Sequence, residues 1–151
     1  MKNKDELYAL INTHVVEITE QVAGLELSES HPVELKDLCT VHLAVRGSYQ
    51  LDLFLYADKK TMEHIASNMK KSPVAEEEIK LYTVEFFNIL GGRIVSKINR
   101  QYKQSARFTP PAFFAERVEH NIDDKDVLTL FYRHSSGNVK VEGQFAKCEN
   151  F

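Results

Sequence analysis

The 151-residue sequence has few of the features that mark specialised protein classes. Its only two cysteines, Cys39 and Cys148, form no C-x-x-C motif and no disulfide framework. Long apolar runs are missing, so no segment reaches the length of a membrane span, and the first ten residues contain no run suited to a signal peptide. These absences favour a soluble protein of a reducing, cytoplasmic compartment.

An excess of charge of one sign is also missing. The formal net charge of -3 provides neither a basic face for nucleic acid nor a polyanionic tail. The six histidines form no H-x-x-x-H or H-E-x-x-H pair, and the stretch GGRIVSK lacks the spacing of a phosphate-binding loop. We therefore expect ordinary surface or strand histidines, no metal site and no bound nucleotide.

The residues that are abundant predict a folded domain. A hydrophobic fraction of 43% can fill the core of one domain over residues 1–151. Helical periodicity covers residues 5–24, 57–71 and 75–102, whereas strand patterns cover 39–56, 106–120, 126–134 and 138–147. Gly47 and Ser48 mark a turn in the first strand region, and Pro110 and Pro111 interrupt the second. This order predicts an α+β fold, in which helices pack on an antiparallel sheet.

The long helix over residues 75–102 contains two adjacent glycines. Each of Gly91 and Gly92 costs about 1 kcal/mol relative to alanine inside a helix. At about 100° per residue, one side collects the core stripe Phe87, Leu90, Ile94 and Ile98. The opposite side collects Glu85, Asn88, Gly92, Ser96 and Asn99. Gly91 lies nearer the apolar side and favours close helix–sheet packing, while Gly92 leaves room for the backbone of another molecule.

The polar side of this helix combines several features of a docking surface. Glu85 and Asn88 are three residues apart and therefore neighbours on one exposed face. Leu81 and Ile89 flank them and are apolar where a solvated face would carry charge. The alternative is that Glu85 and Asn88 are ordinary solvent-facing residues. The aromatic pairs at residues 86–87 and 113–114 are expected in the core.

The same stretch resembles the signature of the CheC/CheX/FliY family of response-regulator phosphatases. The family pattern is Asp or Ser, three residues, Glu, two residues, Asn and, after twenty-two further residues, Pro. Glu85 and Asn88 match it, and the gap ends at Pro111 in the segment FTPP. Leu81 departs from it, because it stands where Asp or Ser is expected. The two glycines and the single Glu-x-x-Asn resemble the one-site CheX type.

The resemblance implies a CheC/CheX-like two-layer sandwich that hydrolyses the aspartyl phosphate of a CheY-like receiver domain. The receiver brings the phosphoaspartate, a Mg²⁺ and a lysine, so this chain needs no cofactor of its own. Asn88 would hold the attacking water, and Glu85 would pair with the receiver's lysine. Partner binding is expected at Glu85 and at Leu81, Ile89, Gly92 and Ser96. CheX relatives also imply a homodimer.

Two other readings stay open. One is a non-catalytic CheX-like module that only binds a receiver or another signalling protein, and Leu81 is its best argument. The other is a structural dimer module that uses the edge of its sheet.

Overall fold

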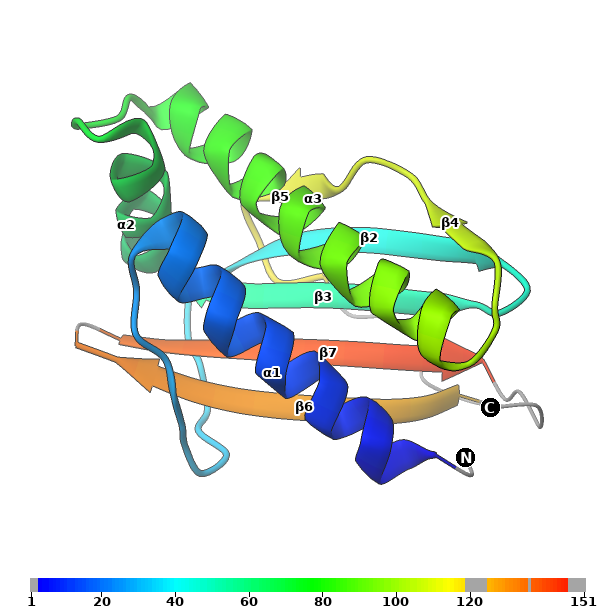
Figure 1. Cartoon of the computed structure of the whole chain (residues 1–151). Coiled ribbons are helices and arrows are strands. Elements are labelled where there is room, and N and C mark those ends of the chain that lie inside the picture. Colours follow the sequence, from blue (N-terminus) through cyan, green and yellow to red (C-terminus); the bar gives the residue numbers. More distant parts are fainter. Residues whose placement is uncertain (1–2, 119–124, 136, 147–151) are drawn as a thin grey trace.

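The computed structural model describes residues 3–118, 125–135 and 137–146, and in these ranges it confirms the α+β prediction. Three helices lie on one face of a seven-stranded antiparallel sheet (Figure 1). The helices are α1 (Lys4–Ala23), α2 (Lys59–Lys70) and α3 (Glu76–Gln101). The strands are β1 (Ser28–Glu29), β2 (Leu38–Gly47), β3 (Leu51–Asp58), β4 (Ala106–Phe108), β5 (Ala112–Phe114), β6 (Lys125–His134) and β7 (Gly137–Ala146). The order across the sheet is β1-β6-β7-β3-β2-β4, and β5 also pairs with β2.

Local capping interactions fix one end of each of the three predicted helices. Gly24 follows α1 in the left-handed conformation, with φ 63°, and its N–H donates to Glu20 O. Asp58 caps α2, because its Oδ1 accepts from Thr61 N at 2.7 Å. Glu78 Oε1 accepts from Ala75 N at 2.9 Å at the start of α3. The sequence-based boundaries are therefore confirmed to within a residue or two.

The central strand β3 is buried on both faces. Leu51, Leu53 and Leu55 alternate on the helix side, as predicted, and belong to the main core. Phe54 and Tyr56, which point the other way, are also buried and form a second small cluster with Leu38. The outer face of this part of the sheet is therefore covered by something other than the helices.

The cover on the outer face includes the chain that follows β5. Thr40 Oγ1 on β2 donates to Glu116 O at 2.8 Å, and Tyr56 Oη on β3 donates to Val118 O at 3.2 Å. Residues 115–118 thus cross the back of β2 and β3 and contribute to burying their outward side chains.

A divided strand closes the sheet beside β2. β4 pairs with Val45–Gly47, while β5 pairs with Thr40–His42 further along β2. Thr109 N still donates to Ala44 O between them, but the two prolines that follow have no N–H to donate. The predicted interruption at Pro110 and Pro111 is confirmed, and it carries the chain past α3.

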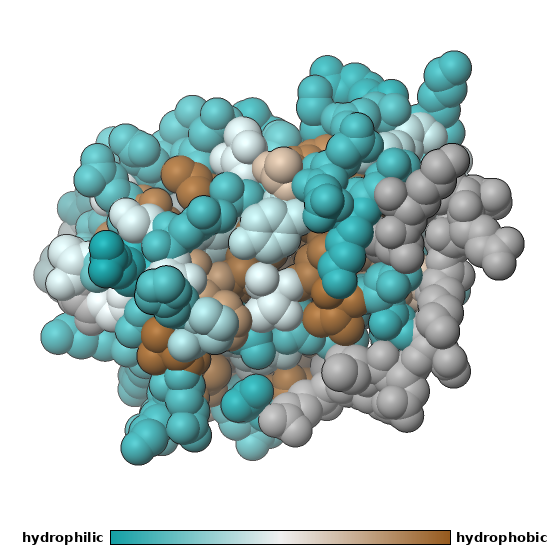
Figure 2. Space-filling model, turned by 90° about the horizontal axis from the view of Figure 1, so that it is seen from below, coloured by the Kyte–Doolittle hydropathy of each residue, from teal (hydrophilic) through white to brown (hydrophobic). Residues whose placement is uncertain are grey.

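In the described residues, no helix is both long and apolar enough to cross a membrane. Seen from the β6 side, the surface is largely hydrophilic, and its hydrophobic residues form small separate patches (Figure 2).

An ionic network on the outer sheet face surrounds Asp52, whose exposed fraction is only 7%. Its Oδ1 lies 2.8 Å from His42 Nε2 and 3.2 Å from Arg46 Nη2, and its Oδ2 lies 3.7 Å from Lys125 Nζ. Burial raises the pKa of Asp52, but the hydrogen bonds and charges of His42 and Arg46 together outweigh it. The pKa of Asp52 therefore lies below its ordinary value of 3.8.

This network predicts a pH-dependent difference between wild type and Asp52→Asn. At neutral pH the variant loses charge-assisted bonds and is less stable by roughly 1–2 kcal/mol, allowing for solvent screening. Because the folded-state pKa is lowered, this contribution is present above pH 3.8 and disappears as the pH falls through the folded pKa. Urea unfolding of both proteins at pH 7 and pH 3 measures it. An equal difference at both values would contradict the assignment.

Candidate functional site

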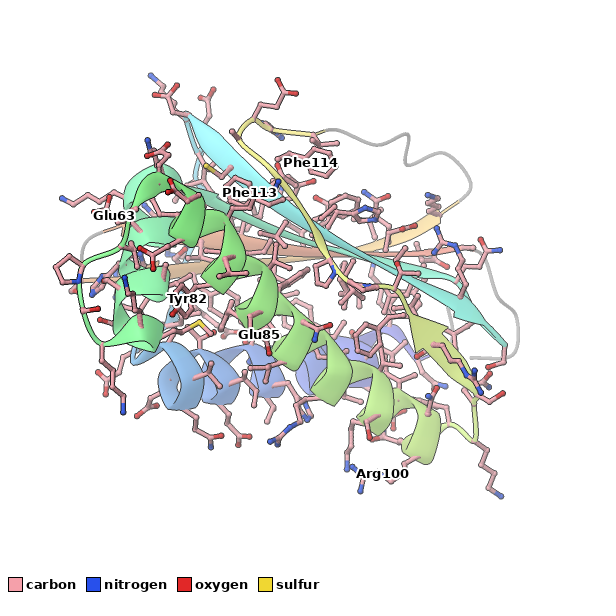
Figure 3. The ribbon with its side chains drawn as sticks, turned by 90° about the horizontal axis from the view of Figure 1, so that it is seen from above. Glu63, Tyr82, Glu85, Arg100, Phe113 and Phe114 are labelled. Atoms are coloured by element: carbon pink, nitrogen blue, oxygen red, sulfur yellow. The ribbon has the colours of Figure 1, made fainter. Side chains whose placement is uncertain are left out.

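The exposed side of α3 carries a row of side chains that we call the α3 ridge: Leu81, Glu85, Asn88, Gly92 and Ser96. Leu81 is 65% exposed, Glu85 and Ser96 are exposed, and Asn88 is half-buried. Glu85 projects from the middle of the helix, on the side turned toward the viewer in Figure 3. Across the described residues, no hydrogen bond or ion pair holds the side chain of Glu85 or Asn88. Both are therefore available to a partner.

The opposite side of α3 fixes the orientation of this ridge. Phe87, Leu90, Ile94 and Ile98 are completely buried, as the core stripe predicts. Ile89, which was expected at the partner interface, is partly buried and packs against the main core. The helix cannot rotate without exposing these side chains, so the ridge is held toward solvent.

Asn99 is a correction to the predicted exposed side. Its Nδ2 donates to Ala106 O at 3.1 Å, and its Oδ1 accepts from Ala106 N at 3.2 Å. Both ends of the amide thus join the last turn of α3 to the start of β4. The helical periodicity placed Asn99 correctly on that side, but β4 folds back against it.

The two glycines have different surroundings. A Cβ on Gly91 would lie 2.5 Å from Leu43 Cδ1 on β2, which confirms that Gly91 permits close helix–sheet packing. A Cβ on Gly92 would lie 3.4 Å from Phe108 Cζ on β4, an ordinary contact. Gly92 was predicted on the exposed side of α3, and the structure adds Phe108 as a neighbour that the sequence did not indicate. Gly92 remains half-buried at the edge of the ridge.

The aromatic pairs divide between core and surface. Phe86 and Phe87 are buried, as expected. Phe113 is half-buried against the main core, but Phe114 is 36% exposed, so its expected core position is wrong. Successive side chains of a strand point to opposite faces. Only one of two adjacent phenylalanines on β5 can therefore reach the core beneath α3.

A groove of about 410 Å³ runs between α3 and β5, and we call it the α3–β5 groove. It is lined by Glu77, Lys80, Leu81 and Val84 of α3 and by Pro111, Ala112 and Phe113. Phe113 and Phe114 appear on β5 beside the helix in Figure 3. Sequence reasoning missed this groove, because nearly thirty residues separate its two walls in the chain and only the spacing to Pro111 pointed to their proximity.

Three histidines hold neighbouring parts of the fold together through their side chains. His42 pairs with Asp52, His14 Nδ1 lies 2.8 Å from Leu10 O, and His134 Nε2 lies 3.1 Å from Thr61 Oγ1. The part of the chain that the structure describes holds no group of three or more potential metal ligands. Cys39 is a buried thiol whose pKa is raised by burial. His120 and Cys148 lie outside the described residues.

The fold and the ridge together define a class of protein. This chain is a two-layer α+β sandwich whose longest helix carries Glu85 and Asn88 on its exposed side, near Pro111 at the edge of the sheet. A family model described as "Chemotaxis phosphatase CheX" matches residues 39–131, more than half of the chain. The chain belongs to this CheX family.

Solved structures agree with the family. A chemotaxis protein CheX from Desulfovibrio desulfuricans is 11% identical with a TM-score of 0.79, and the match covers 93% of this chain and 99% of that one. The CheX–CheY–BeF₃–Mg²⁺ complex from Borrelia burgdorferi gives 15% identity, a TM-score of 0.79 and coverages of 92% and 97%. FliY from Thermotoga maritima is 14% identical with a TM-score of 0.66, and the match covers 95% of this chain and 89% of that one. These TM-scores establish that this chain shares their fold. Among curated proteins, no sequence matches this chain significantly.

The glycine contacts predict opposite effects for two alanine substitutions. Gly91→Ala forces a Cβ against fully buried Leu43 and should destabilise the protein by about 1–3 kcal/mol. Gly92→Ala makes only an ordinary contact with Phe108 and should leave stability unchanged or raise it by up to about 1 kcal/mol. Denaturant unfolding of both variants measures this. Equal effects would mean that α3 does not pack on β2 as described.

Proposed function

We propose that this protein accelerates hydrolysis of the aspartyl phosphate on a CheY-like response regulator. The observation that carries the proposal is the pair Glu85 and Asn88 on the α3 ridge, whose side chains are bonded to none of the described residues. The resemblance to the CheX signature assigns the same two residues to the site. Water attacks phosphorus, the bond between phosphorus and the aspartyl oxygen breaks, inorganic phosphate leaves, and the receiver's aspartate carboxylate is regenerated.

Asn88 suits the task of positioning water. Its carboxamide can both donate and accept a hydrogen bond, so it can hold a water molecule in a defined orientation. In phosphoryl transfer, positioning and electrostatic stabilisation supply almost all of the catalysis, and glutamine performs this task in GTPases. The loose transition state requires no general base, so an amide that holds the attacking water is sufficient.

Glu85 suits the task of orienting the partner. It lies one helical turn before Asn88, so the two Cβ atoms are about 5–6 Å apart. The receiver's lysine, expected from the family resemblance, would form a charge-assisted bond with its carboxylate. This pair would fix the depth and angle at which Asn88 enters the receiver's site. Mg²⁺ would belong to the receiver and not to this chain.

The relatives support this proposal at the level of the family. The family description names a chemotaxis phosphatase, and a related CheX has been solved together with CheY, BeF₃ and Mg²⁺. We further propose that the protein is cytoplasmic and forms a homodimer, as its resemblance to CheX implies.

One observation favours a second function. Leu81 occupies the position where the family pattern has Asp or Ser. If that polar residue is essential for activity, the chain is a module that binds a receiver without accelerating dephosphorylation. Binding without acceleration would identify this case.

Asn88→Ala separates chemistry from binding. Asn88 lies on the surface, so the fold should change by no more than about ±0.5 kcal/mol. Loss of one preorganised polar group commonly reduces a rate by about 10²–10³. Decay of a radiolabelled phosphoryl group on a purified receiver should therefore return nearly to its unassisted rate, while affinity is retained.

Two further variants sharpen this experiment. Asn88→Gln should recover little activity, because an added methylene displaces the amide from the reacting atoms. Gln21→Ala removes an exposed amide from α1 and should leave the rate unchanged. Full activity of Asn88→Ala would show that Asn88 does not position the attacking water, and the catalytic assignment of this residue would be wrong.

Glu85→Lys tests the orienting contact. The substitution places two positive charges together in the docked complex and should weaken binding by several kcal/mol. Affinity is measured by titration against a receiver loaded with beryllofluoride and Mg²⁺. Glu17→Lys makes the same charge change on the exposed side of α1 and serves as the control. If both variants bind like wild type, Glu85 is outside the interface.

A further inference from the structure

The most exposed large hydrophobic side chain in the described structure lies at the site itself. Leu81 is 65% exposed and sits one helical turn before Glu85 on the α3 ridge. Leu81 and Val84 line the α3–β5 groove from the helix, and Phe113 lines it from the opposite wall. Contiguous apolar surface of this kind marks interaction sites more often than isolated hydrophobic residues do.

The groove has the composition of the centre of a protein interface. Its apolar lining comes from Leu81, Val84 and the segment 111–113, and its charged lining residues are Glu77 and Lys80. An apolar centre within a polar rim is the usual arrangement in protein–protein recognition. The two walls come from a helix and from an edge strand, and both are anchored to the core.

The position of the groove identifies its occupant. Asn88, Glu85 and Leu81 follow one another along the ridge, and Leu81 lies seven residues, or about 10 Å, from Asn88. A receiver domain of roughly 120 residues has a radius of gyration of about 14 Å. A receiver that contacts both Asn88 and Glu85 extends toward the start of α3 and covers Leu81. No second protein can then occupy the groove.

We propose that Leu81 and the α3–β5 groove determine which receiver this protein accepts, by burying an apolar side chain that the cognate receiver carries beside its phosphorylation site. The proposal rests on the proposed function, since it assumes that the receiver docks on the α3 ridge. An Asp or Ser at position 81 would favour a polar or basic group there. Leu81 instead leaves such a group desolvated without a partner, which discriminates against receivers that carry one.

The test uses a panel of purified receivers, each loaded with beryllofluoride and Mg²⁺ for affinity or with labelled phosphate for rate. Leu81→Ala should weaken binding of the best receiver by about tenfold or more, because it removes apolar contact without replacing it. Leu81→Met should bind within about threefold of wild type. At saturating concentration, both should dephosphorylate the receiver at the wild-type rate, since neither changes Asn88.

Leu81→Asp tests specificity and not only affinity. This variant restores the family pattern and should weaken the best receiver while improving the relative affinity of receivers that present a polar or basic group. Val33→Ala removes another exposed aliphatic side chain, in the loop between β1 and β2, and should change nothing. Thermal melts of all variants should coincide with wild type.

The outcomes separate the two proposals. If wild type accelerates decay on a receiver and Leu81→Ala binds that receiver as wild type does, the groove does not determine specificity and only the inference on Leu81 fails. If Leu81→Ala lowers the saturated rate and not the affinity, Leu81 acts in the chemical step and the inference is equally wrong. If wild type neither accelerates decay on any receiver nor binds one, both the proposed function and the inference on Leu81 are wrong.

Discussion

The close packing of Gly91 against Leu43 determines how α3 sits on the sheet. Because Gly91 has no side chain, the helix backbone approaches β2 closely, and Leu43 is fully buried beneath it. Asn99 then holds the last turn of α3 to β4 through both atoms of its amide. With one side of the helix fixed in this way, Glu85 and Asn88 must face outward. No bond from the side chain of Glu85 or Asn88 is needed to hold these residues on the exposed side.

A rigid support of this kind suits a reaction that depends on positioning. An amide that orients water contributes only if it is held in place before the partner arrives. The buried face of α3 holds the helix in place, so residues of the α3 ridge can be substituted without unfolding the protein. The broken edge strand adds a second wall, because the Thr-Pro-Pro segment brings Phe113 beside Leu81. Helix and strand thus jointly form the surface that a receiver would meet.

The sequence predicted the helices and the long strands well, because period and capping chemistry are local. It also predicted the buried and exposed sides of α3. Its errors have a common cause: each depends on which distant segment packs against a residue. Phe108 lies beside Gly92, and Asn99 is hydrogen-bonded to the first residue of β4. Phe114 lies on the face of β5 that points away from the main core. Helical periodicity predicts the direction of a side chain but not the tertiary neighbour that meets it.

The most direct test of the central claim is the structure of this protein in complex with a receiver loaded with beryllofluoride and Mg²⁺. The account predicts that the α3 ridge enters the receiver's phosphorylation site. Asn88 should lie within hydrogen-bond distance of a water in line with the leaving aspartyl oxygen, and Glu85 should lie beside the receiver's lysine. A complex in which the receiver binds another face, with Asn88 still in contact with bulk solvent, would contradict it.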